Sequence, residues 1–251
     1  MNKLKIINTT VKLDIKKQIK FLHITDSHIF RDDTSGWNRK AEFDKDFDGC
    51  AEEYFCQAIQ YAKERNMPII HTGDIIDFLS FGNFEFLEKA FPKKLDYIFA
   101  VGNHDFVDFA DIQKGQQENK EYKERQMNTI AKYIKNNLYF SSILVGDVNV
   151  VTIDNSLYQI TDGQLDMLKA EVAKGLPIIL CMHIPLFAPG LAQAAQVDWC
   201  PKVTFTLGAP DEVLATYQTI RFLSPHTSTA IFTASSTESF LLLWAMMPRL
   251  Y

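Results

Sequence analysis

The sequence of 251 residues is poor in the features that mark several protein classes. It has four cysteines, and no two of them have the CxxC spacing: Cys50, Cys56, Cys181 and Cys200. The longest late apolar run, 240–247, stops at Pro248, far short of the roughly 20 residues that a membrane-spanning helix needs. The first twenty residues alternate lysine with apolar residues and lack the apolar core of a secretory signal. We therefore expect a cytoplasmic protein with reduced thiols and no membrane partner.

The sequence also lacks an excess of positive charge. Lysine and arginine number 26 against 31 aspartates and glutamates, which gives a net charge of −5. A protein that binds duplex nucleic acid normally carries a basic face, so nucleic acid is an unfavoured partner. The apolar fraction of 47% and the charged fraction of 23% exclude a disordered, collagen-like or coiled-coil chain. With no repeat, linker or boundary in view, residues 1–251 are predicted to form a single domain.

Short apolar runs alternate with segments of helical periodicity along most of the chain. Strands are predicted at 19–24, 67–71, 95–101, 142–145, 148–153, 177–182 and 229–233. Helices are predicted at 47–65, 84–90, 113–137 and 165–174, the last opened by a capping box at 161–164. Gly146 and Asp147 form the turn signal of a hairpin between the fourth and fifth strands. This alternation predicts an α/β fold with a covered, mixed sheet.

Polar side chains follow four of these strands at the point where each strand ends. The candidate site residues are Asp26, His28, Asp74, Asn103, His104 and His183. In open α/β sheets functional groups gather beyond the carboxyl ends of the strands. Aspartate, histidine and asparagine are ligands for hard or borderline metal ions, so the pattern predicts a metal centre.

The spacing of these residues has physical reasons. Asp26 and His28 are two residues apart, so in an extended chain they project to the same side. Gly73 and Gly102 allow tight turns that bring a short side chain close to a metal ion. Asp74 has two carboxylate oxygens and could bridge two cations.

Other polar residues near these motifs are assigned structural roles. His23 and His71 are expected to be structural, and Asp77 is expected to orient loops or cap a helix. Arg31, Trp37 and Arg39 could contact a substrate, but a solvated flap is the favoured interpretation of this segment.

Four motifs occur in order: Asp26-Ser27-His28, Gly73-Asp74-Ile75-Ile76-Asp77, Gly102-Asn103-His104-Asp105 and the lone His183. Over residues 19–185 this order resembles the calcineurin-like metallophosphoesterase family. The resemblance implies a four-layer α/β/β/α sandwich of two mixed sheets. It also implies hydrolysis of a phosphomonoester or phosphodiester, in a small phosphorylated substrate, by a hydroxide that bridges two metal ions.

The resemblance also implies roles for the individual residues. One metal ion would be held by Asp26, His28 and Asp74, and the other by Asp74, Asn103 and His183. Manganese, iron and zinc all suit such ligands. His104 would be the catalytic residue that protonates the leaving oxygen or stabilises the transition state, with Asp105 orienting its ring.

The fifth motif of the family, Gly-His-x-His, is absent. An ungapped placement puts 234–237 there, with Ser235 and Thr237 in place of the two histidines, and hydroxyls are weaker ligands than imidazole. His226 is the only histidine after His183, and it precedes the predicted strand. The sequence leaves open whether the C-terminal part is truncated, frame-shifted or naturally divergent.

Three functions follow from these observations. The first is a metal-dependent phosphoesterase, impaired to some degree by the loss of the last two ligands. The alternative is a catalytically weak or inactive relative that acts as a binding or scaffold protein. A nuclease of the same superfamily is less favoured, because no basic stretch studded with aromatic residues is present. The sequence does not decide the substrate or the oligomeric state.

Overall fold

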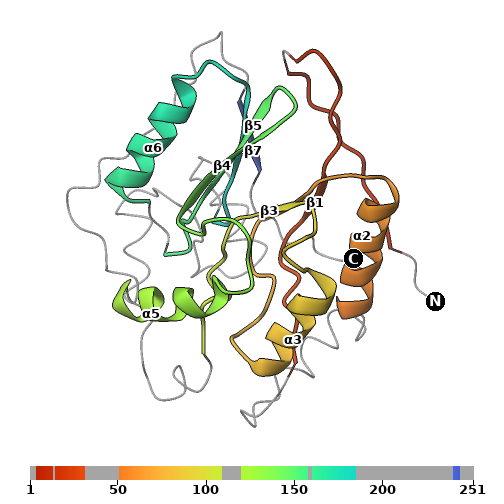
Figure 1. Cartoon of the computed structure of the whole chain (residues 1–251), viewed down its shortest axis with the longest axis vertical. Coiled ribbons are helices and arrows are strands. Elements are labelled where there is room, and N and C mark those ends of the chain that lie inside the picture. The colour runs from red at the N-terminus through yellow and green to blue at the C-terminus, as the bar shows by residue number, and fades with distance from the viewer. Residues whose placement is uncertain are drawn as a thin grey trace, which may run out of the picture.

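The computed structural model describes residues 4–13, 15–31, 51–108, 120–157, 160–184 and 240–243. Within these ranges the chain forms an α/β fold with two sheets and four helices (Figure 1). In chain order the elements are β1 (Leu22–Ile24), α2 (Ala51–Glu64), β2 (Ile69–His71), α3 (Phe81–Ala90), β3 (Tyr97–Phe99), α5 (Lys120–Ile130), β4 (Phe140–Val145), β5 (Val148–Ile153), α6 (Asp162–Val172), β6 (Ile178–Cys181) and β7 (Phe240–Leu243). No helix in the described ranges has the length and apolar character to cross a bilayer.

The two sheets differ in strand direction. The first has the order β1-β2-β3, and both of its pairings are parallel. The second has the order β4-β5-β6-β7, with an antiparallel β4–β5 hairpin and parallel pairings from β5 to β7. The expectation of two mixed sheets is therefore met by the second sheet, while the described part of the first sheet is parallel throughout. Its strands are joined through α2 and α3, as parallel neighbours require.

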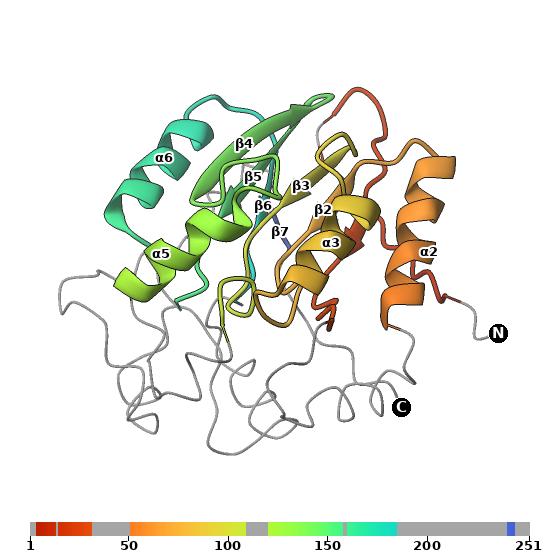
Figure 2. The same cartoon turned by 60° about the horizontal axis from the view of Figure 1, so that its bottom comes forward.

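Three apolar clusters hold the layers together. The first joins the three-stranded sheet to α2 and α3 and includes Phe55 and Tyr97. The second joins the inner faces of the two sheets and includes Ile70 and Val150. The third joins the outer face of the second sheet to α6 through Leu168. Figure 2 shows the same order, with α6 beyond one sheet and α2 and α3 beyond the other.

The helices follow from their sequences. In α2 the buried residues Phe55, Ala58, Ile59 and Ala62 form one stripe at helical spacing. At the start of α6 the Thr161 side chain accepts from the backbone of Gln164, whose side chain reaches back, so the predicted capping box is confirmed. Helix α5 runs over Lys120–Ile130 and is shorter than the predicted helix at 113–137, of which 113–119 lie outside the described residues.

The six strands predicted between residues 19 and 182 are all present. The strand predicted at 229–233 and the segment 234–237 lie outside the described residues. The structure places a strand that the sequence analysis does not predict, β7, beside β6. Its four consecutive apolar residues lack the alternation of a half-exposed strand, but parallel strands commonly have continuous apolar sequences.

Candidate metal centre

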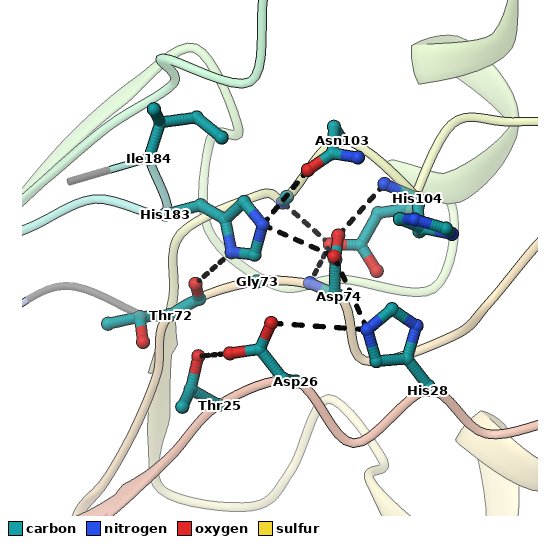
Figure 3. A network of polar contacts seen from close by, with 12 residues as sticks. Thr25, Asp26, His28, Thr72, Gly73, Asp74, Asn103, His104, His183 and Ile184 are labelled. Carbon is teal, nitrogen blue, oxygen red and sulfur yellow. Dashed lines mark hydrogen bonds and ion pairs between the residues drawn. The ribbon is translucent and has the colours of Figure 1, made fainter. Parts of the chain in front are cut away.

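The structure brings all six predicted site residues together at one edge of the sheets (Figure 3). Asp26 and His28 follow β1, Asp74 follows β2, and Asn103 and His104 follow β3, while His183 follows β6 of the other sheet. The site therefore lies where the carboxyl ends of both sheets meet.

The Asp74 carboxylate lies at the centre of this group. Its Oδ2 atom is 3.2 Å from Nε2 of His183 and 3.5 Å from Nε2 of His28. Nε2 of His28 is 3.9 Å from Oδ1 of Asp26, and Nε2 of His183 is 3.0 Å from Oδ1 of Asn103. Side chains from four separate segments of the chain thus present oxygen and nitrogen atoms to one small volume.

Two overlapping groups have donor atoms that all lie within 4.8 Å of one another. One is His28, Asp74 and His104, and the other is Asp26, Asp74 and His183. Asp74 belongs to both groups, as expected of a bridging ligand. The groups differ from the ligand sets implied by the resemblance in that His104 joins the first and Asp26 lies with His183.

The backbone at three of these residues is in the left-handed region. The φ angles are 50° at Asp26, 39° at His28 and 53° at Asp74. Asp26 and His28 do converge, as predicted. The predicted reason, an extended chain, is wrong, because these residues lie in turns. Backbone N–H groups of Asp26 and His28 donate to the carbonyls of Gly73 and Asp74 at 3.0 and 2.9 Å, which holds the first two ligand loops against each other. Left-handed residues other than glycine are strained, and such strain gathers at functional sites.

Gly73 and Gly102 are required for close approach of the loops. A Cβ at Gly102 would lie 2.2 Å from Oδ1 of Asp74, and one at Gly73 would lie 2.7 Å from Nδ1 of His183. Gly73 also has a φ of 97°, which L side chains rarely adopt. The geometry thus supports the prediction that glycine is needed at these positions for tight turns and close approach.

Asp105 holds the loops and does not orient His104. Its buried carboxylate accepts backbone N–H groups from Asp74 at 2.9 Å, Ile75 at 2.8 Å and Gly102 at 2.7 Å. Burial and the charge of Asp74 raise the pKa of Asp105 to about 7, against the opposing effect of the Gly102 and Ile76 N–H groups. Both oxygens are engaged by the backbone, which is the physical reason that the implied role of Asp105 is wrong.

Asp77 takes the place expected of Asp105. It is fully buried, and its Oδ1 atom lies 2.9 Å from Nδ1 of His28, while Nδ1 of His104 lies 3.1 Å from both the Asp77 backbone carbonyl and Oδ1. The two rings meet edge to face with centroids 4.7 Å apart. Asp77 therefore fixes the orientation of both rings, His28 through its carboxylate and His104 through its backbone carbonyl and carboxylate, and turns each Nε2 atom away from itself.

The charges of the site are strongly coupled. Burial alone would raise the pKa of Asp74, but His183, His104 and His28 outweigh it and hold the pKa below its ordinary value. Burial alone would lower the pKa of His183, but Asp74, Asp26 and the Thr72 carbonyl raise it to about 10. The protonated ring of His183 thus supplies the positive charge that the buried carboxylates require.

The residues expected to be structural lie beneath the ligand loops. The buried His71 accepts the Gly73 N–H through Nδ1 at 3.2 Å and contacts the Ser27 hydroxyl through Nε2 at 3.0 Å. Burial, followed by the charge of His23, lowers the pKa of His71 to about 3, so the ring is neutral. Since Nδ1 is an acceptor, Nε2 carries the proton and donates it to Ser27.

The segment after the first motif is fixed at its start. Arg31 forms a two-pronged ion pair with Glu52 at 2.7 and 2.5 Å, and its guanidinium lies over the ring of Phe86. The Arg31 guanidinium, which the sequence analysis names as a possible substrate contact, is therefore already paired within the protein. Trp37 and Arg39 lie outside the described residues.

Asn155 was not singled out from the sequence, although it contacts the His183 segment. It accepts the backbone N–H groups of His183 and Ile184. The available signal was its place in the polar sequence Asp154-Asn155-Ser156 directly after the strand 148–153, the same position that marks the ligands. The sequence Asp154-Asn155-Ser156 does not match any of the ligand motifs, so a comparison of motifs does not identify Asn155.

The donor set fits a metal ion. Atoms bound to one ion by bonds of about 2.1 Å lie about 3.0 to 3.4 Å apart in tetrahedral or octahedral geometry. The separations of 3.2 and 3.5 Å around Asp74 and of 3.0 Å between His183 and Asn103 are close to that spacing. A cation would replace the proton on His183, because imidazole must be deprotonated to bind it.

The calcineurin-like phosphoesterase family model matches residues 19–209 of the chain. The protein therefore belongs to the calcineurin-like phosphoesterase family, whose members are metal-dependent phosphoester hydrolases. The chain is also 28% identical over 171 residues to the 3',5'-cyclic adenosine monophosphate phosphodiesterase CpdA of Haemophilus influenzae. That alignment covers 66% of this chain and 55% of the relative, so the chain spans about half the length of the curated relative it matches.

Proposed function

We propose that this protein hydrolyses a phosphomonoester or phosphodiester with the help of two metal ions. Asp26, His28 and Asp74 would hold one ion, and Asp74, Asn103 and His183 the other. The observation that carries this proposal is the convergence of donor atoms on the Asp74 carboxylate at separations of 3.2 and 3.5 Å. Bound manganese, iron or zinc would polarise the phosphoryl group and lower the pKa of water.

His104 is the residue that we propose to act on the leaving group. Its Nδ1 atom faces Asp77 at 3.1 Å, so Nε2 is the ring nitrogen that can donate a proton. Its side chain is 25% exposed, whereas that of His28 is 2% exposed, so His104 lies at the open side of the site. A general acid in that position can reach the leaving oxygen of a substrate that enters from solvent.

The substrate we propose is a small phosphorylated molecule, and a 3',5'-cyclic nucleotide is the first candidate. The support is the activity that the name of the Haemophilus influenzae relative states, together with an alignment that covers 66% of this chain. We further propose that the whole chain forms the four-layer sandwich of the family, supported by the three clusters that alternate with the two sheets. The reduced cytoplasm is the compartment we propose, since Cys56 and Cys181 are free thiols.

The experiment is a hydrolysis assay on metal-free protein to which manganese is returned. The substrates are p-nitrophenyl phosphate, bis-p-nitrophenyl phosphate and 3',5'-cyclic AMP. Asp74→Ala is expected to abolish turnover and His104→Ala to lower it about 10²- to 10⁴-fold, the usual contribution of a general acid. Asp166→Ala is the matched control, because this exposed aspartate on α6 pairs only with Lys169 among the contacts described. Normal turnover in both Asp74→Ala and His104→Ala would refute the proposal.

A second candidate is a weak or inactive relative that binds ligands without turning them over. It is favoured by the absence of any histidine after His226 in the sequence. Elemental analysis of protein purified without added metal separates the two candidates. Retention of two ions per chain after dialysis would argue against this second function, and retention of none would favour it.

A further experiment tests the placement of the fifth motif. Ser235→His and Thr237→His are combined, and turnover that does not rise would show that the ungapped placement at 234–237 is wrong.

A further inference from the structure

The segment that carries His183 is held by one amide side chain. Asn155 follows β5 and is fully buried. Its Oδ1 atom accepts the backbone N–H groups of His183 and Ile184, each at 3.1 Å, and its Nδ2 atom donates to the Ile184 carbonyl at 2.7 Å. Every hydrogen bond described for this side chain therefore ends on the same two residues.

We propose that Asn155 is a positioning residue that sets the His183 imidazole for metal binding. This inference rests on the proposed function in so far as His183 is a ligand. In the contacts described, Asn155 hydrogen-bonds to the side chain of no candidate ligand, so it acts through the backbone of His183.

The need for such a residue follows from where His183 must reach. It leaves the second sheet, but its ring contacts groups that belong to the first. Nδ1 lies 2.8 Å from the carbonyl of Thr72, and Nε2 lies 3.2 Å from Asp74 and 3.0 Å from Asn103. The Thr72 carbonyl fixes the rotation of the ring, and Asn155 fixes the backbone from which the ring projects. Ligands held to a few tenths of an ångström need support of this kind.

Asn155 is itself held rigidly by its neighbours. Oδ1 of Asp154 accepts the backbone N–H of Ser156 at 3.0 Å and its hydroxyl at 2.7 Å. The other oxygen of Asp154 pairs with Lys123 of α5 at 2.5 Å, and the Asp154 carbonyl accepts from Gln164 of α6 at 2.8 Å. The turn 154–156 is thus tied to two helices, so the amide of Asn155 is oriented before any metal ion binds.

The test compares Asn155→Ala and Asn155→Asp with Asn149→Ala. Asn149 is the matched control, because it lies on β5, the strand that Asn155 follows, is 3% exposed and bonds to Ser142 and Glu171, away from the candidate ligands. Two readouts are needed: the affinity for Co²⁺, from its absorption spectrum, and the ¹H–¹⁵N signals of the His183 ring in metal-free protein. The ring signals are assigned by their absence in His183→Gln.

Asn155→Ala is expected to weaken Co²⁺ binding about 10- to 100-fold and to shift the His183 ring signals. Asn155→Asp keeps the acceptor for both N–H groups, so it should recover much of the affinity. Asn149→Ala should change neither readout, although it also removes a buried amide. Equal loss of affinity in Asn149→Ala, or unchanged ring signals in Asn155→Ala, would overturn the proposal.

Two further outcomes keep the inference apart from the proposed function. If Asn155→Ala does not fold, Asn155→Leu replaces it, since leucine has a similar volume and accepts no hydrogen bond, and unchanged ring signals in that variant overturn the inference. If the native protein binds no Co²⁺, the proposed metal-dependent activity fails. The ring signals of metal-free protein then decide the role of Asn155 alone.

Discussion

Replacing His71 by asparagine is expected to flatten the dependence of stability on pH. The His71 ring lies among Phe55, Phe91 and Phe99 and is fully buried. Burial lowers its pKa to about 3 in the folded protein, against 6.5 for an unperturbed histidine. Asparagine keeps an acceptor near the position of Nδ1 for the Gly73 N–H and does not titrate in this range.

The sign and size of the expected change in the free energy of unfolding follow from proton linkage. Between pH 6.5 and pH 3 the unfolded chain binds a proton at residue 71 that the folded chain does not, so acid favours unfolding. The free energy of unfolding therefore falls as the pH is lowered through this window. For one such group the loss from pH 7 to pH 5 is about 2 kcal/mol.

The assay is urea unfolding at pH 7 and at pH 5, with a chelator present so that metal binding does not contribute. The difference between the two pH values should be about 2 kcal/mol larger in the native protein than in His71→Asn. His23→Asn on the neighbouring strand β1 is the comparison variant: burial also lowers the pKa of His23, but less strongly than that of His71, so this variant should change the difference less. Equal pH dependence in the native protein and His71→Asn would show that His71 is not held neutral by burial.

Three further predictions concern the site itself. Asp77→Ala removes the carboxylate that holds Nδ1 of His28 and faces Nδ1 of His104, so turnover by the manganese-loaded enzyme should fall about 10- to 100-fold at a temperature where the variant is still folded. Gly102→Ala places a Cβ 2.2 Å from Oδ1 of Asp74, and Co²⁺ titration should show lost binding, whereas Gly175→Ala, with no atom within 4 Å of the added carbon, should bind normally. Manganese at 100 times its dissociation constant should stabilise the native protein by about 2.7 kcal/mol in thermal unfolding but not Asp74→Ala; equal shifts in both would place the ion elsewhere.

The parts of the fold that could be predicted from the sequence are those set by local patterns. The capping box at Thr161 and the β4–β5 hairpin around Gly146 are short-range features, and both are present as expected. The strand β7 could not be predicted, because a run of four apolar residues has the same pattern in a parallel strand as in a buried helix. Its assignment depends on pairing with β6, a contact that is distant in sequence.

In the site, too, the features set by local sequence could be predicted, and those set by contacts distant in sequence could not. Asp26, Asp74 and His183 could be found because each follows an apolar run at a strand end. The roles of Asp77 and Asp105 were exchanged, since a sequence motif lists carboxylates without saying which one meets a ring and which one meets backbone N–H groups. That choice depends on contacts distant in sequence, from Asp105 to the N–H groups of 74–75 and from Asp77 to His28, between loops that include left-handed turns at Asp26 and Asp74.

Those turns have a consequence for engineering this protein. A left-handed residue other than glycine costs about 1 to 2 kcal/mol, so Asp26, His28 and Asp74 together withhold about 3 to 6 kcal/mol of stability. Glycine at any of them would relax the backbone while deleting a ligand. A library selected only for heat resistance or soluble yield should therefore become enriched in variants that have lost one or more of these ligands. Such a selection must be combined with a selection for metal binding.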